Sequence, residues 1–221
     1  MPYIDFVGKL HKSTSRDYLE RVTMYDKAAS AEIAGRFGCD YWDGDRQYGF
    51  GGYYYDGRWS IVADAMIKHY NIGSGSRILD VGCGKGFLLY EFMQLVPGVE
   101  VCGIDISDYA VENAKEEVKP SLTVGSAGEL LPWDDESFDF VYSINTLHNL
   151  YNHEVHTALN EIERVGRGYS HVTVESYRNE QEKVNLLYWQ LTCRAFMKPE
   201  EWEWAFKQAG YSGDYGCIYF E

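Results

Sequence analysis

The last three quarters of the chain alternate between two hydrophobic patterns. Short apolar runs predict buried strands at residues 77–82, 99–105, 121–125, 138–145 and 170–176, and an aromatic run predicts a last strand near 215–220. Apolar residues spaced by three and four predict helices at residues 59–70, 87–96, 110–118, 155–162 and 202–209. Strands and helices that alternate in this way indicate an α/β fold with a doubly wound, mostly parallel sheet, whose ligands bind at the carboxyl ends of the strands.

The first quarter of the chain follows another pattern. Residues 14–37 predict one bent helix or two, and Thr14 and Asp17 have the spacing of a capping box. Residues 38–58 hold six glycines without sustained periodicity, which predicts a long loop or a short hairpin. We therefore expect an N-terminal helical and loop extension at 1–59 and an α/β domain at 60–221. Long ordered loops are frequently functional, so the extension is a candidate for the substrate side.

The charge of the chain narrows the class of partner. The formal net charge is −14, which disfavours nucleic acid. Residues 1–60 carry eight basic and nine acidic side chains, whereas residues 61–221 carry 12 basic and 25 acidic side chains. The basic side chains of the extension are therefore candidates for contact with an anionic small molecule, and the alternative is a solvated helix face with paired charges.

Cysteine usage and hydropathy indicate the compartment. The five cysteines form no C-x-x-C pair, and no His/Cys set has zinc-finger spacing, so we expect free thiols and no essential metal. The N-terminus lacks the pattern of a signal peptide, and no window approaches the ~18 apolar residues of a membrane span. These features predict a cytoplasmic protein without a membrane partner.

The most informative stretch is ILDVGCGKGF at residues 78–87, a strand followed by a glycine turn and a helix. Phe87 breaks the dinucleotide fingerprint, and Gly86 after Lys85 breaks the phosphate loop. Asp80 would repel a pyrophosphate and suits a ligand with a cationic end. Asp105, at the end of the next strand, can accept both hydroxyls of an adenosine ribose. A cationic amino-acid tail and an intact ribose diol together describe S-adenosylmethionine.

The chain resembles the class I S-adenosylmethionine-dependent methyltransferases over about residues 60–215. The resemblance is carried by ILDVGCGKGF, by VCGIDIS at 101–107, by SAGELLPWDDESFDFVYSINTLHNL at 126–150 and by EIERV at 161–165. It implies a Rossmann-like sheet of the seven-stranded type and S-adenosyl-L-methionine as cofactor. Matched by position, it implies cofactor contacts from Asp80, Gly82, Cys83, Gly84, Gly86, Asp105, Ile106, Ser126, Ala127 and Asn145.

The sequence departs from the family pattern in three places. Ser126 and Ala127 stand where many members have an acidic residue followed by a small one. Residues 165–169 read VGRGY in place of the usual L-K-P-G-G turn before the fifth strand. The C-terminal antiparallel pair is shortened, and Leu191–Phe196 is the candidate for its second strand.

The class I fold fixes the cofactor rather than the methyl acceptor, so acceptor residues are sought in the extension. Arginine can bind phosphate or carboxylate bidentately, and aromatic rings can stack on sugars or bases. We expect acceptor contacts from Lys12, Arg16, Tyr18, Trp42, Arg46, Tyr54 and Arg58. Residues 38–59 then form a lid over the site, and the alternative is a structural hairpin.

Methyl transfer to an oxygen needs a base in many enzymes. His148 is the first candidate, because imidazole titrates near neutrality, and Asn145 would face the transferred methyl group. The alternative for His148 is a capping or core histidine.

A closer resemblance links residues 9–22 and 40–59 to methyltransferases encoded with bacterial surface-polysaccharide genes. It implies O-methylation of a small molecule such as a sugar, a nucleotide-linked sugar or a phosphorylated metabolite. Three other functions remain open: another enzyme on the same fold, such as an aminopropyl transferase, methylation of a protein or finished glycan, and a catalytically silent module that binds S-adenosylmethionine.

Overall fold

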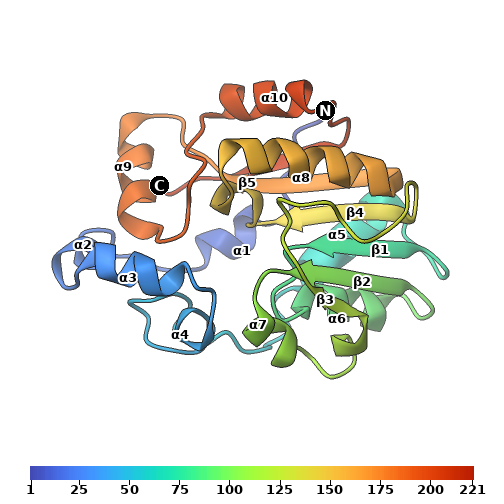
Figure 1. Cartoon of the computed structure of the whole chain (residues 1–221), viewed down its shortest axis with the longest axis horizontal. Helices are drawn as coiled ribbons and strands as arrows, with labels where there is room; N and C mark the ends of the chain where they lie inside the picture. Colours follow the sequence, from blue (N-terminus) through green and yellow to red (C-terminus); the bar gives the residue numbers. More distant parts are fainter.

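The computed structural model describes residues 1–221 and has one parallel sheet at its centre (Figure 1). Its six strands are β1 (Arg77–Val81), β2 (Glu100–Asp105), β3 (Leu122–Val124), β4 (Phe138–Ile144), β5 (Gly166–Glu175) and β6 (Asp214–Ile218). Their spatial order is β3-β2-β1-β4-β5-β6, and every neighbouring pair is parallel. The doubly wound α/β fold predicted from the hydrophobic pattern is confirmed.

The seventh strand is absent, and Leu191–Phe196 is not a strand. The backbone N–H groups of Arg194 and Ala195 donate to the carbonyl oxygen of His148, at 2.8 and 3.0 Å, instead of to a sheet neighbour. Strand β6 therefore pairs directly with β5, and Tyr3 adds one isolated parallel bridge to Tyr215 at the outer edge. The expectation of a second C-terminal strand was wrong.

Helices cover both faces of the sheet (Figure 1). They are α1 (Gly8–Lys12), α2 (Glu20–Thr23), α3 (Lys27–Ala34), α4 (Cys39–Trp42), α5 (Ser60–Tyr70), α6 (Phe87–Leu95), α7 (Asp108–Glu112), α8 (Asn152–Val165), α9 (Glu180–Trp189) and α10 (Pro199–Gln208), with 3-10 turns η1 (Lys119–Ser121) and η2 (Leu147–Asn149). One core packs α8 and α10 on the sheet through residues such as Trp202. The other packs α5 and α6 on the opposite face through residues such as Met66 and Phe92.

The extension is less helical than predicted. Residues 14–37 form the two short helices α2 and α3, and Thr14 caps neither of them. Asp17 instead accepts a hydrogen bond from the backbone of Glu20, and Asp26 caps α3 through Ala29. Because each Asp can satisfy the free N–H groups of a new helix start, the chain breaks into two helices.

The hairpin alternative for residues 38–58 was wrong, because this segment contains helix α4 and turns but no strand. Its aromatic side chains pack on one another and on α6. The Trp42 and Phe50 rings stack with centroids 5.2 Å apart, and the Tyr53 and Phe87 rings stack at 4.9 Å. Aromatic packing therefore orders this segment together with its own backbone hydrogen bonds, such as that from Phe50 N–H to the Tyr41 carbonyl at 2.9 Å.

Three helical regions were not predicted correctly. The single turn α1 and the longer α9 were missed, and α7 ends at Glu112 rather than near residue 118. Ala114 and Val118 remain buried, but in turns beyond α7. No helix of the chain has both the length and the apolar character that a bilayer crossing needs.

Candidate active site

The glycine turn joins β1 to α6 and brings the backbone close to two side chains. Gly82 has φ of 91°, and a Cβ there would lie 1.9 Å from Thr146 Oγ1. Gly84 has φ of 53°, and its Cβ would lie 2.8 Å from the Trp42 ring. Only glycine combines this left-handed backbone with so little room. Gly86 has φ of 70° and precedes the first residue of α6.

A cavity of about 270 Å³, here called the first cavity, lies where β1, β2 and β4 end. It is lined by all the residues predicted to contact the cofactor except Gly86, namely Asp80, Gly82, Cys83, Gly84, Asp105, Ile106, Ser126, Ala127 and Asn145. Trp42, which we expected on the acceptor side, also lines it. The parallel sheet brings these residues together because its strands all end at the same edge.

Two buried carboxylates face the first cavity, and each suits one end of the expected cofactor. Asp105 is oriented by the backbone N–H groups of Gly84 and Ser107, at 2.7 and 2.9 Å, and burial raises its pKa. Its remaining lone pairs can accept hydroxyl donors. Asp80 is 5% exposed, no cation of the chain pairs with it, and burial raises its pKa well above the usual range. A buried carboxylate without a cation suits a ligand with a positive end, so the residues present fit S-adenosylmethionine.

A second cavity of about 410 Å³ adjoins the first. The two share lining residues, among them Tyr53, Phe87 and Asn145. The predicted acceptor residues Arg16, Arg46, Tyr54 and Arg58 line the second cavity, and so does His148. The fold thus gathers cations from the extension beside the cofactor residues of the sheet.

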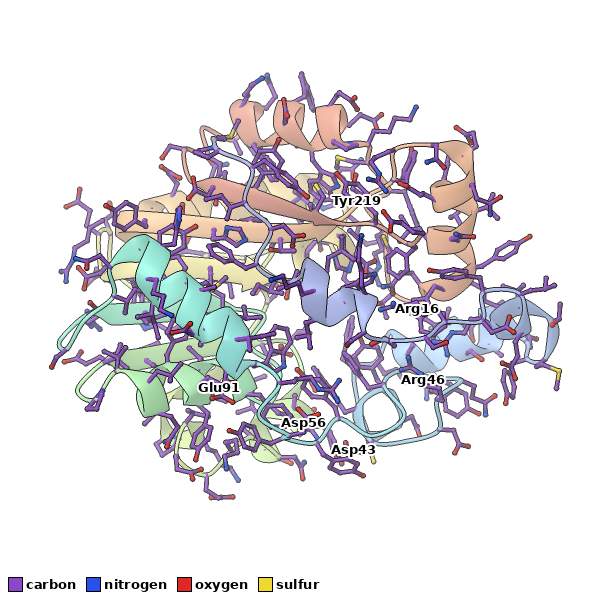
Figure 2. The ribbon with its side chains drawn as sticks, turned by 180° about the vertical axis from the view of Figure 1, so that it is seen from behind. Arg16, Asp43, Arg46, Asp56, Glu91 and Tyr219 are labelled. Atoms are coloured by element: carbon purple, nitrogen blue, oxygen red, sulfur yellow. The ribbon has the colours of Figure 1, made fainter.

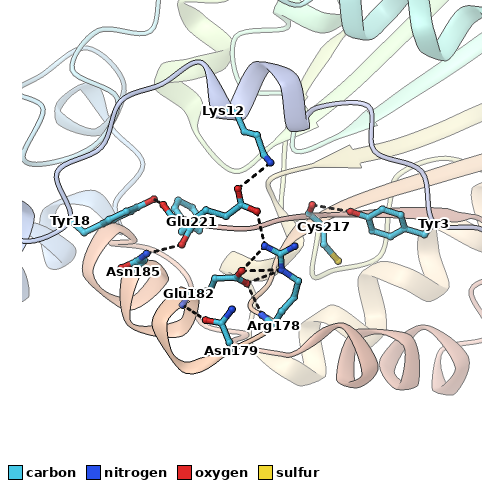
Figure 3. A network of polar contacts seen from close by, with 10 residues as sticks. Tyr3, Lys12, Tyr18, Arg178, Asn179, Glu182, Asn185, Cys217 and Glu221 are labelled. Atoms are coloured by element: carbon cyan, nitrogen blue, oxygen red, sulfur yellow. Dashed lines mark hydrogen bonds and ion pairs between the residues drawn. The ribbon is translucent and has the colours of Figure 1, made fainter.

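Lys12 and Tyr18 line neither cavity, contrary to the expectation for acceptor residues. Lys12 Nζ lies 3.1 Å from a carboxylate oxygen of Glu221, and the Tyr18 hydroxyl donates to the backbone carbonyl of Glu221 at 3.2 Å (Figure 3). Arg178 holds the same Glu221 side chain at 2.7 Å. Both residues therefore fasten the extension to the segment that follows β6.

His148 and Glu175 form a buried pair at the second cavity. The backbone N–H of Glu175 donates to His148 Nδ1 at 3.3 Å, so the ring proton of neutral His148 lies on Nε2, 3.4 Å from Glu175 Oε2. Burial lowers the pKa of His148 to about 3 and raises that of Glu175 to about 8. Neutral His148 has no free nitrogen to accept a proton, whereas Glu175 Oε2 has no hydrogen-bond partner.

The sequence reasoning missed Glu175 and a second pair that holds the extension in place. Glu175 could have been found from its place at the end of a predicted strand. Lys85, in the glycine turn, is 3% exposed, and its Nζ lies 2.7 Å from an Asp43 carboxylate oxygen. The Tyr109 hydroxyl donates to the same carboxylate at 2.8 Å. Sequence spacing offered no signal for this contact, because its partners are 42 residues apart.

Comparison with known proteins indicates a methyltransferase. A family model described as a methyltransferase domain matches residues 79–172. The O-methyltransferase rstn1 of Aspergillus nomiae is 28% identical over 167 residues, covering 69% of this chain and 68% of that protein. The demethylmenaquinone methyltransferase of Roseiflexus castenholzii is 28% identical over 176 residues, which cover 78% of this chain and 66% of that protein. The chain thus spans about two thirds of the length of both relatives.

A solved structure extends the comparison to the fold. The geranyl diphosphate C-methyltransferase of Streptomyces coelicolor A3(2) aligns with a TM-score of 0.55 at 14% identity, covering 66% of this chain and 58% of that one. That protein was solved in complex with Mg²⁺, geranyl diphosphate and S-adenosyl-L-homocysteine. The fold is that of the class I methyltransferases, and the family match includes the glycine turn and the strand ends that line the first cavity. Together they support an S-adenosylmethionine-dependent methyltransferase.

Proposed function

We propose that this methyltransferase methylates an oxygen of a small molecule held in the second cavity. The observation that carries the proposal is the junction of the two cavities beside a buried carboxylate. Asn145 lines both cavities, and Glu175 and His148 line the second. A volume of about 410 Å³ is in the range of small-molecule sites.

Each residue at the junction has a distinct role in this proposal. Asp105 accepts the ribose hydroxyls, and Asp80 faces the cationic end of the cofactor. When bound, S-adenosylmethionine would supply an electrophilic methyl group and would leave as S-adenosyl-L-homocysteine once its bond to that carbon breaks. The acceptor oxygen would form the new bond to carbon as its proton passes to a base. Glu175, in its ionised form, is that base, and its Oε2 accepts the proton. His148 is a positioning residue, because its Nε2 lies 3.4 Å from Glu175 Oε2 and its Nδ1 accepts a hydrogen bond from the backbone N–H of Glu175.

Residues 38–59 act as a lid in this proposal, and the chain divides into the extension at 1–59 and the methyltransferase domain at 60–221. The support is the set of contacts that cross the division. Trp42 Nε1 donates to Ser107 Oγ at 2.9 Å, Tyr55 donates to Glu91 at 2.9 Å, and Asp43 pairs with Lys85. A lid of aromatic rings excludes water from the reacting atoms, which favours transfer to the acceptor.

The acceptor class that we favour is a sugar, a nucleotide-linked sugar or a phosphorylated metabolite of surface-polysaccharide biosynthesis. The arginines of the second cavity support an anionic acceptor. The name of the Aspergillus relative supports an oxygen as the methylated atom. A protein or finished glycan, and a silent cofactor-binding module, are the alternatives that the experiment must separate.

The test is transfer from methyl-labelled S-adenosylmethionine into a bacterial extract that is then separated by size. We expect label in the small-molecule fraction, at least a hundredfold less with Glu175→Gln, and unchanged label with Glu180→Gln, a matched change at an exposed site. Label only in macromolecules would contradict the small acceptor. Cofactor binding without any labelled product would indicate the silent module.

A further inference from the structure

Three arginines of the extension converge on one ring. The guanidinium carbons of Arg16, Arg21 and Arg46 lie 5.4, 5.1 and 5.1 Å from the centre of the Trp189 ring. All four residues line the second cavity, and Figure 2 shows Arg16 and Arg46 near each other. Three positive charges are thus collected at one end of this cavity in a chain whose net charge is −14.

None of these arginines has a carboxylate partner. Arg16 Nη1 donates to the carbonyls of His11 and Thr14 at 3.0 Å, and Arg46 Nη1 donates to those of Gly49 and Phe50 at 2.9 Å. Carbonyl groups orient a guanidinium but leave its charge uncompensated. By contrast, Arg58 of the same cavity forms an ion pair, with its Nη2 2.5 Å from Asp56 Oδ2.

Several guanidinium N–H groups remain without a partner. Arg16 Nε is buried and makes no hydrogen bond. Arg21 donates through Nε to Trp189 and through Nη1 to Arg46, which leaves its Nη2 unused. Arg46 uses only Nη1. Burial lowers the pKa of Arg21 to about 10, and the charge of Arg46 adds to the effect. The charge of Glu175 acts on Arg16, but no carboxylate forms an ion pair with any of the three arginines.

The carboxyl end of α9 explains only part of this cluster. Lys27 Nζ donates to the carbonyls of Tyr188 and Gln190 at 2.8 and 2.6 Å, and Arg21 Nε donates to that of Trp189 at 3.3 Å. Such contacts are typical of cations that satisfy the last carbonyls of a helix. Arg16 and Arg46 make no contact of this kind, so helix capping leaves them unexplained.

We infer that Arg16, Arg21 and Arg46 bind the phosphoryl group of a phosphorylated small acceptor whose remaining part extends toward Asn145 and Glu175. The inference rests on the proposed function and narrows its acceptor class. A phosphoryl group carries up to two charges and three terminal oxygens, which match three guanidinium groups better than one carboxylate does. Trp189 supplies the apolar surface on which the guanidinium planes rest.

Calorimetry on protein loaded with S-adenosyl-L-homocysteine tests the inference without turnover. The probes are phenyl phosphate, benzoate and phenol, which share a ring and differ in charge. We expect phenyl phosphate to bind at least tenfold more tightly than benzoate and phenol not to bind measurably. Arg21→Gln and Arg46→Gln should each weaken the binding of phenyl phosphate about tenfold, because each substitution removes charge-assisted hydrogen bonds.

Arg167→Gln is the matched control, because it removes the same charge from an exposed arginine that pairs with Asp139 outside both cavities. It should leave phenyl phosphate binding unchanged. Retained affinity for S-adenosyl-L-homocysteine shows that each variant is folded. Equal binding by wild type and both cluster variants, no binding of phenyl phosphate, or tighter binding of benzoate would overturn the inference.

The two proposals fail in different ways. Methyl transfer to a neutral acceptor, without phenyl phosphate binding, would overturn this inference and leave the proposed function standing. Phenyl phosphate binding that depends on the arginines, without methyl transfer to any small molecule, would overturn the proposed function and leave the anion site standing.

Discussion

Three buried carboxylates lie near the carboxyl ends of β1, β2 and β5, and each has different surroundings. Asp105 is held by two backbone N–H groups, Asp80 faces its cavity without a cation, and Glu175 Oε2 has no hydrogen-bond partner. All three have a raised pKa because burial disfavours the charged form. A side-chain carboxylate can therefore accept a hydrogen bond from a hydroxyl group, face a cation or accept a proton, depending on its surroundings.

Asp105→Asn should weaken binding of S-adenosyl-L-homocysteine at least tenfold. The amide keeps the shape of the side chain but loses the charge that strengthens hydrogen bonds to hydroxyl donors. Calorimetry measures the affinity, and Asp108→Asn, a change at an exposed site three residues away, should have no effect. An unchanged affinity in Asp105→Asn would remove Asp105 from the cofactor site.

The rate of methyl transfer should rise with pH and level off above about 8. Glu175 accepts a proton only when it is ionised, and burial raises its pKa to about 8. The pKa of His148 is lowered to about 3, so His148 stays neutral throughout this range. Turnover measured between pH 5 and 9 at saturating acceptor shows the profile.

Two variants show which residue causes the rise of the rate with pH. Glu175→Gln should abolish the rise, whereas His148→Gln should lower turnover and keep a rise with a shifted midpoint. A rise centred near pH 6.5 that disappears only in His148→Gln would restore His148 as the base.

At the scale of elements, side-chain contacts with the glycine turn and with α7 hold the segment 38–59 in addition to its own backbone hydrogen bonds. Asp43 accepts hydrogen bonds from Lys85 and Tyr109, which belong to the glycine turn and to α7. Lys85 is 3% exposed, so loss of Asp43 would leave a buried charge without a partner. Breaking such a pair typically costs about 3–5 kcal/mol, which is large compared with the stability of a loop.

Asp43→Asn should therefore open the segment locally. We expect faster hydrogen exchange and faster proteolytic cleavage within residues 40–59, together with weaker binding of the acceptor. Asp45→Asn is the matched control, because the exposed Asp45 side chain makes no ion pair. Equal exchange in wild type and Asp43→Asn would show that the aromatic packing alone holds the segment.

At the scale of the whole molecule, Glu175 links stability to pH. Its pKa rises from 4.5 in the unfolded chain to about 8 in the folded one, so the folded state binds more protons between these values. The free energy of unfolding therefore falls as pH rises through this window. Denaturant unfolding at pH 5 and pH 8.5 should show Glu175→Gln gaining stability relative to wild type, by roughly 1.4 kcal/mol per unit of pH.

Other carboxylates change the absolute stability, so the prediction concerns the difference between the variant and wild type. The difference between Glu180→Gln and wild type should not change with pH, because Glu180 is exposed. A constant difference in Glu175→Gln as well would show that Glu175 is already ionised in the folded protein at pH 5.

The predictions from sequence succeeded where a pattern was local. The strands from β1 to β6 follow from apolar runs, and α5, α6, α8 and α10 from regular spacing. The predictions failed where packing between distant segments decided the structure. Helix α9 has apolar residues on several sides, and residues 38–58 are ordered by rings that meet Phe87 of α6.

The sequence by itself determined the strands of the sheet, the glycine turn and the residues that line the first cavity, because each depends on neighbours within a few positions. Asp80, Asp105 and Asn145 line one cavity because they lie at or just beyond the carboxyl ends of β1, β2 and β4, which share one edge of the sheet. Only the tertiary structure decided the acceptor side. In the folded chain, His148 lies beside Glu175, and Lys12 and Tyr18 lie outside both cavities. Arg16, Arg21 and Arg46 lie around the Trp189 ring. These contacts join residues far apart along the chain, and no local spacing encodes them.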